Sequence, residues 1–281
     1  MAEIRIENVS YVYSEGTPFE VGAVNGIDAV IRSGVVTGII GHTGSGKSTL
    51  VQMLNGLIKP QGGRILLDGE DIWANPKEIK KVRSRVGLVM QYPEYQLFEE
   101  TVRADIAFGP KNMGLDAKDI EERVLEAADF VGLESEYLDK SPFDLSGGQK
   151  RRAAIAGIVA MRPEVLVLDE PAAGLDPVGR ETVMQSIMRY KETTGASIVI
   201  VSHSMEDMAR YCDELIVLSE GKLLMSGKKA EVFANADKLI SVGLDVPQIT
   251  SVMNMLAELG LDVTRAVYTV EDAVKEIKKL I

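Results

Sequence analysis

A glycine-rich segment early in the chain has the composition of a phosphate-binding loop. Its glycines let the backbone curl, so that main-chain N–H groups can point at phosphate oxygens, and the start of the following helix adds positive potential. We expect Lys47 to bridge the β- and γ-phosphates of a nucleotide and Ser48 to bind Mg²⁺. A plain glycine-rich turn is the alternative, which the flanking strand and helix disfavour. The segment consists of Gly41, His42, Thr43, Gly44, Ser45, Gly46, Lys47, Ser48 and Thr49.

Two adjacent carboxylates follow an apolar run further along the chain. Asp169 and Glu170 come directly after residues 165–168 and before Pro171. We expect Asp169 to hold Mg²⁺, directly or through water. We expect Glu170 to lie beside the attacking water, which a carboxylate can polarise or deprotonate during phosphoryl transfer. Either acid alone could be an ordinary charge at a strand end, but the adjacent pair favours the catalytic interpretation.

A buried sheet is needed to bring these residues together. Four runs are apolar on both faces, as is typical of central parallel strands. Directly after the glycine loop, Leu50, Val51, Leu54 and Leu57 have helical spacing, which predicts a helix there. The order of strand, glycine loop and helix therefore predicts an α/β fold. The apolar runs are residues 35–40, 86–90, 165–168 and 198–201.

The remaining segments have other patterns. Alternating apolar residues from Ile4 to Tyr13 predict a strand at the N-terminus. Residues 92–160 have mostly helical spacing, which predicts a helical segment inserted into the core. Residues 215–218 and 222–225 flank a Glu-Gly pair and predict a hairpin.

A shift in composition after Gly227 marks a C-terminal part. Helices are expected at residues 247–259 and 270–281. Pro247 suits a first helical position. Thr269 and Asp272 resemble a capping box in which Asp replaces the usual Glu.

The overall composition limits the class of protein. At 281 residues and 46% apolar, the chain can form one large domain or a domain with an appendage. Its net charge of −11 argues against nucleic acid as a main ligand, because phosphate backbones attract basic surfaces. The basic stretch at residues 77–85 is interpreted as a solvated face that leads into a strand.

The expected compartment follows from cysteine content and apolar runs. Cys212 is the single cysteine, so an internal disulfide is impossible and a reducing cytoplasm is the natural setting. The first residues carry charge at once, unlike a signal peptide, and no apolar run is long enough to span a bilayer. We expect a soluble protein whose link to a membrane goes through a partner.

Five motifs occur in a fixed order: the glycine loop, Gln91, residues 145–149, the Asp169–Glu170 pair and His203. This ordered set resembles the ATP-binding cassette (ABC) ATPases, over residues 4–227. The resemblance implies an ABC-type P-loop NTPase core with an antiparallel β subdomain and a helical subdomain inserted at about residues 92–160. It implies an ATPase domain at residues 1–227 and a C-terminal helical extension at residues 228–281 that serves in dimerisation or as an accessory.

The resemblance also implies roles for single residues. Gln91 matches the glutamine that senses nucleotide, contacts Mg²⁺ and joins the core to the helical subdomain, and Asp176 matches the loop that crosses to the opposite site. His203 matches the residue that hydrogen-bonds the γ-phosphate and the water, although a lone histidine is more often structural. Each site then needs two chains, because the signature of one subunit contacts the γ-phosphate held by the other. The signature consists of Leu145, Ser146, Gly147, Gly148 and Gln149.

One aromatic residue near the N-terminus completes the implied site. Tyr13 matches the residue that stacks on adenine in this family. Tyr11 is close in sequence and could be the stacking residue or part of the core instead. Both possibilities stay open at this point.

Two segments narrow the family further. Residues 91–98 and 150–157 resemble the ATPases of energy-coupling factor (ECF) transporters and their cobalt/nickel relatives, and Gly157 replaces an arginine common in importer cassettes. Within that group, the sequence Tyr-Pro-Glu-Tyr looks more like that of the second of two paired ATPases. Two interpretations remain for one set of side chains: core packing, or a groove that receives a coupling helix from a membrane scaffold. These are Tyr92, Tyr95, Leu97 and Phe98.

The resemblance implies ATP-driven uptake of a vitamin or metal ion. The implied partners are a second ABC ATPase, in a homodimer or heterodimer, a transmembrane scaffold and a small substrate-binding membrane subunit, with no nucleic acid. The protein would sit peripherally on the cytoplasmic face of the cell membrane. An ordinary importer ATPase that serves a soluble binding protein is the main alternative. DNA-repair ATPases are disfavoured because no heptads precede the signature, and a non-catalytic module because the catalytic residues are present.

Overall fold

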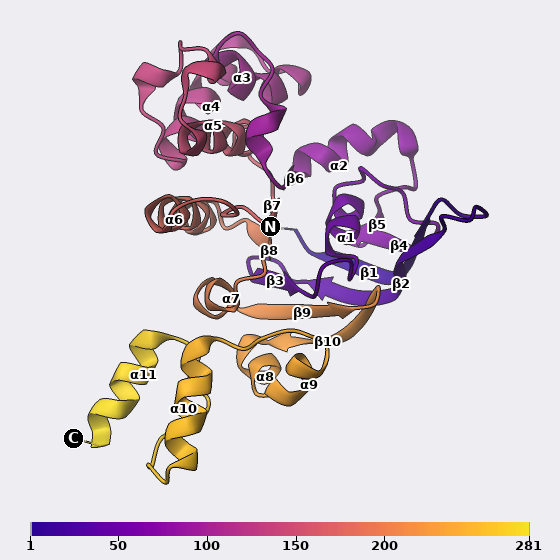
Figure 1. Ribbon diagram of the computed structural model, residues 1–281. Helices are drawn as coiled ribbons and strands as arrows, with labels where there is room; N and C mark the ends of the chain where they lie inside the picture. Colours follow the sequence, from indigo (N-terminus) through magenta and orange to yellow (C-terminus); the bar gives the residue numbers. More distant parts are fainter. Residues whose placement is uncertain (1, 281) are drawn as a thin grey trace.

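The computed structural model describes residues 2–280, and a six-stranded sheet forms its centre (Figure 1). The strand order is β10-β9-β3-β8-β7-β6. The neighbours from β9 to β6 pair in parallel, and only β10 pairs antiparallel within this sheet. The strands are β3 (Val36–Ile40), β6 (Val86–Val89), β7 (Val165–Asp169), β8 (Ser197–Val201), β9 (Glu214–Ser219) and β10 (Lys222–Lys228).

The apolar runs form the central strands, as predicted. Every residue of β3, β6, β7 and β8 is buried, because helices or the second sheet cover both faces. The predicted hairpin is confirmed as β9 and β10. Glu220 and Gly221 form its turn with positive φ values of 49° and 73°, the combination that a tight type I′ turn requires.

A second, antiparallel sheet has the order β2-β1-β4-β5. The predicted N-terminal strand is confirmed as β1, in which Ile4, Ile6 and Val9 point into a core shared with α1 (Lys47–Leu54). The other strands are β2 (Val21–Ile31), β4 (Gly62–Leu67) and β5 (Glu70–Asp71).

The helix after the glycine loop is shorter than predicted. Leu50, Val51 and Leu54 are fully buried on α1, but the helix ends at Leu54. Gly56 has a φ of 69°, so the chain turns away there, and Leu57 lies outside the helix and is 47% exposed. The prediction that Leu57 belongs to the buried helical face is therefore wrong.

Helices occupy the segment between β6 and β7, as predicted. α3 (Val102–Asn112), α4 (Ala117–Phe130) and α5 (Gly147–Val159) pack on one another at the top of Figure 1. Before β6, residues 76–85 form a 3-10 turn (Pro76–Glu78) and α2 (Ile79–Arg85), which have no fully buried residue. The basic stretch is thus a solvated face that leads into a strand. After β7 come α6 (Pro177–Thr194) and α7 (Met205–Tyr211).

The C-terminal part consists of α8 (Lys229–Phe233), α9 (Ala236–Ser241), α10 (Gln248–Glu258) and α11 (Val270–Ile277). Met253, Val267 and Ala273 form a small core of their own there. Pro247 precedes α10 as its N-cap and is not its first helical residue, because its ψ of 135° is extended. The end of the second predicted helix, at Ile281, lies outside the described residues.

The predicted capping box at α11 is only half correct. The Thr269 hydroxyl accepts a hydrogen bond from the Asp272 N–H at 3.2 Å, as an N-cap residue should. The Asp272 carboxylate accepts from the Thr269 hydroxyl at 2.8 Å and does not cap the backbone in return. An aspartate is one methylene shorter than the glutamate of the usual motif, which accounts for the difference. Among residues 2–280, no helix is long and apolar enough to cross a membrane.

Candidate functional site

Four groups of predicted site residues lie at one edge of the central sheet. The glycine loop follows β3, His203 follows β8, Asp169 ends β7, and Gln91 follows β6. Because β3, β8, β7 and β6 are parallel neighbours in that order, their carboxyl ends share an edge. Chain segments far apart in sequence therefore meet there.

The glycine loop holds a buried ammonium group. Lys47 is 6% exposed, and its Nζ donates to the main-chain oxygens of Gly41 at 2.7 Å and His42 at 3.0 Å. Burial lowers the pKa of Lys47, while Glu170 and Asp169 oppose that shift. Gly46 has a φ of 96°, and a Cβ there would lie 2.2 Å from the main-chain oxygen of Ala23, so no other residue fits.

The rest of the loop is fixed by neighbouring elements. His42 Nδ1 lies 2.9 Å from the Thr43 oxygen, and its Nε2 accepts from the N–H of Glu220 at 3.4 Å, which ties the loop to the β9–β10 turn. The Thr43 and Gly44 side of the loop is exposed, whereas Ser45 is buried. The loop thus presents its open side to solvent while its base is anchored.

The two carboxylates have different surroundings. Asp169 is hydrogen-bonded to the Ser48 side chain, and burial raises its pKa. Glu170 has a φ of 52°, a strained conformation for this residue type, and its N–H donates to the Val201 oxygen at 3.0 Å. Burial first, and then repulsion by Asp169, raise the pKa of Glu170 to about 7. A carboxylate with that pKa can take up a proton at neutral pH.

His203 faces Glu170 across the site. Its Nε2 lies 3.5 Å from Glu170 Oε1, an oxygen that has no hydrogen-bond partner within residues 2–280. Burial and then the Lys47 charge lower the pKa of His203, so the ring is neutral at pH 7. A neutral imidazole and a proton-accepting carboxylate therefore flank the same space beside Lys47.

The structure distinguishes the two candidate aromatic residues. Tyr13, at the end of β1, is 39% exposed, and its hydroxyl lies 3.2 Å from Thr49 Oγ1. Tyr11 instead packs against the apolar core and meets the Tyr13 ring edge-on at 4.9 Å. Tyr13 is thus the more exposed of the two residues, and its hydroxyl contacts the glycine loop.

Three predicted site elements lie at or near the surface. Ser146 and Gln149 form a capping box at the start of α5: Ser146 N–H donates to Gln149 Oε1 at 2.8 Å, and Gln149 N–H to Ser146 Oγ at 3.4 Å. Asp176 caps α6 by accepting from the Gly179 N–H at 2.7 Å. Gln91 is exposed beyond the end of β6. The side-chain hydrogen bonds of Ser146, Gln149 and Asp176 thus stay within the starts of their own helices.

Comparison with known proteins identifies the family. The sequence profile described as ABC transporter matches residues 24–173. The chain is 50% identical to the energy-coupling factor transporter ATP-binding protein EcfA2 of Clostridium tetani, over 99% of this chain and 96% of that protein. The chain belongs to the ABC transporter ATPases. A protein of the same name from Caldanaerobacter subterraneus is 52% identical over 98% of this ABC ATPase and 96% of the relative. The predicted resemblance of the chain to the ECF transporter ATPases is confirmed.

Solved structures support the ABC fold. A cbiO1 structure from Clostridium perfringens, described as part of the ABC transporter complex cbiONQ, is 41% identical with a TM-score of 0.75 and covers 89% of this chain and 98% of its own. A dimeric ABC cassette in a post-hydrolysis state with ADP and phosphate is 27% identical with a TM-score of 0.72 and covers 80% and 98%. The protein is an ATP-binding, ATP-hydrolysing transporter subunit.

Sequence reasoning missed one buried ion pair of this ABC ATPase. Arg151 on α5 is 2% exposed, and it donates to both Glu94 oxygens at 2.8 and 3.1 Å. It also donates to the main-chain oxygens of Pro171, at 3.3 Å, and Ala173, directly after the catalytic carboxylates. The Arg151 guanidinium thus joins the signature helix to the segment after Gln91 and to the loop after Glu170. A lysine–arginine run in a helix is normally solvated, so the sequence held no clear signal for it.

The Arg151–Glu94 pair leads to a prediction about stability. Arg151→Met is expected to lower the free energy of unfolding by ~3–5 kcal/mol, because it leaves the mostly buried Glu94 carboxylate and two main-chain oxygens without a donor. Urea unfolding followed by circular dichroism measures the change. Lys118→Met, on the exposed face of α4, is the control and should change it by less than ~0.5 kcal/mol. A loss below ~1 kcal/mol for Arg151→Met would contradict this account.

Proposed function

We propose that this chain is the ATPase of an ECF-type importer that drives uptake of a vitamin or metal ion. The observation that carries the proposal is the alignment of Lys47, Asp169, Glu170 and His203 at one sheet edge, in a chain similar over its full length to ECF transporter ATPases. The full-length similarity disfavours the alternative of an ordinary importer with a soluble binding protein.

The chain's own residues supply most of the proposed mechanism. Lys47 turns from the Gly41 and His42 oxygens to the β- and γ-phosphates, and the N–H groups of residues 41–49 hold the remaining oxygens. Glu170 accepts a proton from the attacking water. His203 orients that water and the γ-phosphate by hydrogen bonds from its neutral ring. Tyr13 stacks on adenine.

The residues fit a magnesium ion. Ser48 and Asp169 offer a hydroxyl and a carboxylate that already lie within hydrogen-bond distance of each other, and Mg²⁺ prefers such hard oxygen donors together with water. Ser48, Asp169 and the amide of Gln91 would hold the ion. When bound with ATP, Mg²⁺ neutralises charge that develops on the phosphate oxygens.

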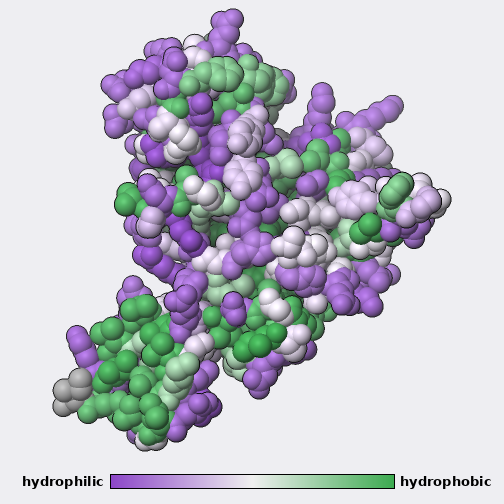
Figure 2. Space-filling view, in the orientation of Figure 1, coloured by the Kyte–Doolittle hydropathy of each residue, from purple (hydrophilic) through white to green (hydrophobic). Residues whose placement is uncertain are grey.

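A second ATPase chain completes each site in this proposal. Residues 146–149 form an exposed helix N-terminus, which suits the γ-phosphate of the opposite subunit, and Asp176 lies in the loop that crosses to it. Support for a lasting pair comes from the C-terminal extension at residues 228–281. Hydrophobic side chains gather over α10 and α11 in Figure 2. In this part of the chain Met255, Leu259 and Val270 are at least 61% exposed.

A groove beside the helical segment supports membrane docking. A cavity of about 580 Å³ lies between α2, α3 and α5 and is largely apolar. Phe98 lines this groove and is 61% exposed, so core packing does not explain it, whereas Leu97, which also lines the groove, packs against the core. Tyr95 is 84% exposed but lies outside the groove lining. We assign this groove to a coupling helix of the transmembrane scaffold. In this proposal the chain sits on the cytoplasmic face of the membrane, together with a small substrate-binding membrane subunit.

Metal dependence tests the proposed catalytic site. The purified protein should hydrolyse ATP with Mg²⁺ present and lose essentially all turnover when EDTA removes the ion, because the γ-phosphate charge is then not neutralised. Phosphate release measured before and after Mg²⁺ is restored gives the result. Hydrolysis that persists at the same rate in excess EDTA would contradict the metal role of Ser48 and Asp169.

A further inference from the structure

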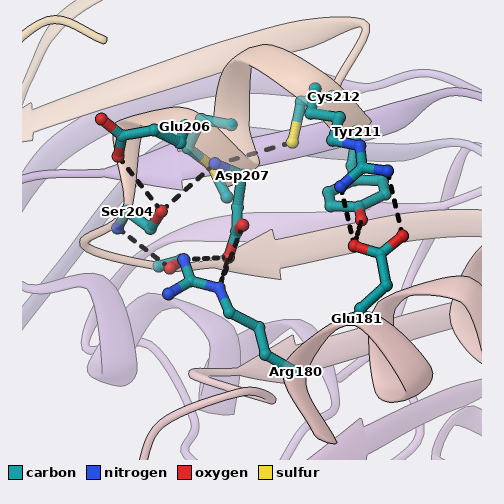
Figure 3. Close-up of polar contacts among 10 residues, drawn as sticks. Arg180, Glu181, Ser204, Glu206, Asp207, Tyr211 and Cys212 are labelled. Atoms are coloured by element: carbon teal, nitrogen blue, oxygen red, sulfur yellow. Dashed lines mark hydrogen bonds and ion pairs between the residues drawn. The ribbon is translucent and has the colours of Figure 1, made fainter. Parts of the chain in front are cut away.

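Two arginine–carboxylate pairs join α6 to α7 (Figure 3). Arg180 on α6 reaches Asp207 on α7, with Nε 3.0 and 3.2 Å from the carboxylate oxygens and Nη2 2.6 Å from one of them. The Asp207 side chain is 12% exposed. A bidentate, charge-assisted pair that is partly shielded from water holds a more definite geometry than a surface ion pair.

The second pair lies further along the same two helices. Glu181 accepts from the Arg210 guanidinium at 2.7 and 2.9 Å and from the Tyr211 hydroxyl at 3.0 Å. Its side chain is 35% exposed, so this outer pair is more open to water than the inner one. Because α7 is held near both its ends, it cannot turn against α6 without breaking one of the pairs.

The inner pair joins the first turns of both helices. α6 begins directly after the proposed site residue Asp176, and α7 begins at Met205, two residues after His203. Asp176 caps α6, and the Arg180 N–H donates to the Asp176 oxygen at 2.9 Å. On the other helix, Asp207 lies four residues after His203, and its N–H donates to the capping Ser204 hydroxyl at 3.2 Å. The Arg180–Asp207 contact therefore lies directly behind both loops.

We propose that Arg180 and Asp207 are positioning residues that make the Asp176 loop and His203 move as one unit. When the partner ATPase orders the Asp176 loop, the start of α6 moves with the loop. The Arg180–Asp207 pair transmits this movement to the first turn of α7, which positions His203 against the γ-phosphate. The occupied state of one site is thereby transmitted to the hydrolysing groups of the other. The inference rests on the proposed function for its roles of Asp176 and His203.

The test compares the inner pair with the outer pair on the same helices. The full-length chain, purified with its partner ATPase, is assayed as Arg180→Gln and as the matched control Arg210→Gln. We expect kcat to fall about 10-fold for Arg180→Gln, while the KM for ATP stays within about twofold of wild type. The reason is that His203 loses its alignment, whereas the residues that bind ATP are unaffected. Arg210→Gln should lower kcat less than about twofold. Equal losses in kcat would mean that both pairs are merely structural and would overturn the inference.

A double-mutant cycle asks whether Arg180 acts through His203. If it does, the Arg180→Gln/His203→Ala protein hydrolyses ATP no more slowly than His203→Ala alone, because the aligned group is already gone. A further 10-fold loss in the double variant would overturn the positioning role. Failure of the proposed function gives a different result: His203→Ala would then retain the wild-type rate, which refutes the role of His203 and this inference with it.

Discussion

Replacing Glu170 with glutamine is expected to stop ATP hydrolysis and leave ATP binding intact. Glu170→Gln keeps the shape of the side chain but removes the carboxylate whose pKa of about 7 suits it to accept a proton from water. General-base groups contribute roughly 10²–10⁴-fold, so turnover at this site should fall by that factor. Phosphate release and fluorescent-nucleotide titration measure the two properties separately.

The same substitution is expected to stabilise the ATP-bound dimer. ATP bridges two chains in the proposed closed state, and a protein that cannot cleave the γ-phosphate stays closed. Size-exclusion chromatography with light scattering, with and without ATP, detects the dimer. Glu192→Gln, at an exposed position on α6, is the control and should hydrolyse ATP normally without accumulating a dimer. Wild-type turnover in Glu170→Gln would refute the assigned role.

Placing a negative charge in the signature is expected to disable the site of the other subunit. A Cβ at Gly147 meets nothing within 4 Å, so Gly147→Asp fits the free chain. In the closed dimer its carboxylate faces a γ-phosphate, and like charges about 4 Å apart repel by about 4 kcal/mol at protein-like screening. Turnover should therefore fall by about 10²–10³-fold, while the unfolding midpoint and ATP binding to the free chain stay unchanged.

Gly147→Ala separates charge from size in this experiment. The alanine adds a methyl group to the same open space without a charge, so its turnover should lie much closer to wild type. Equal losses for Ala and Asp would show that bulk and not repulsion is responsible. Full activity of Gly147→Asp would contradict the placement of the signature at a shared site.

The sheet and its edge residues could be predicted from sequence because their causes are local. A strand buried on both faces must be apolar throughout, and the phosphate loop needs its glycines in a fixed pattern. Asp169 ends one such strand, Glu170 follows it, and His203 lies two residues after the next strand in the sheet, so their meeting at one edge follows from parallel order. Comparison with known proteins then confirmed the family that the ordered motifs indicated.

The features that escaped prediction depend on contacts between distant segments. Arg151 and Glu94 are 57 residues apart, and a helical arginine gives no sign that it is buried until the loop after Glu170 closes over it. The Arg180–Asp207 pair spans 27 residues and joins two helices whose packing only the fold defines. The apolar pattern continues to Leu57, but α1 ends at Leu54 and the left-handed Gly56 turns the chain away, which the spacing of apolar residues does not indicate.

The identity of the proteins bound to this chain in its native membrane tests the central claim most directly. The tagged Glu170→Gln chain, held closed with ATP and Mg²⁺, would be purified from gently solubilised membranes, and its partners identified by mass spectrometry. The account predicts a second ABC ATPase, a transmembrane scaffold and one or more small membrane proteins. A pair of conventional permeases would instead indicate an ordinary importer, and recovery without any membrane protein would contradict a role in transport.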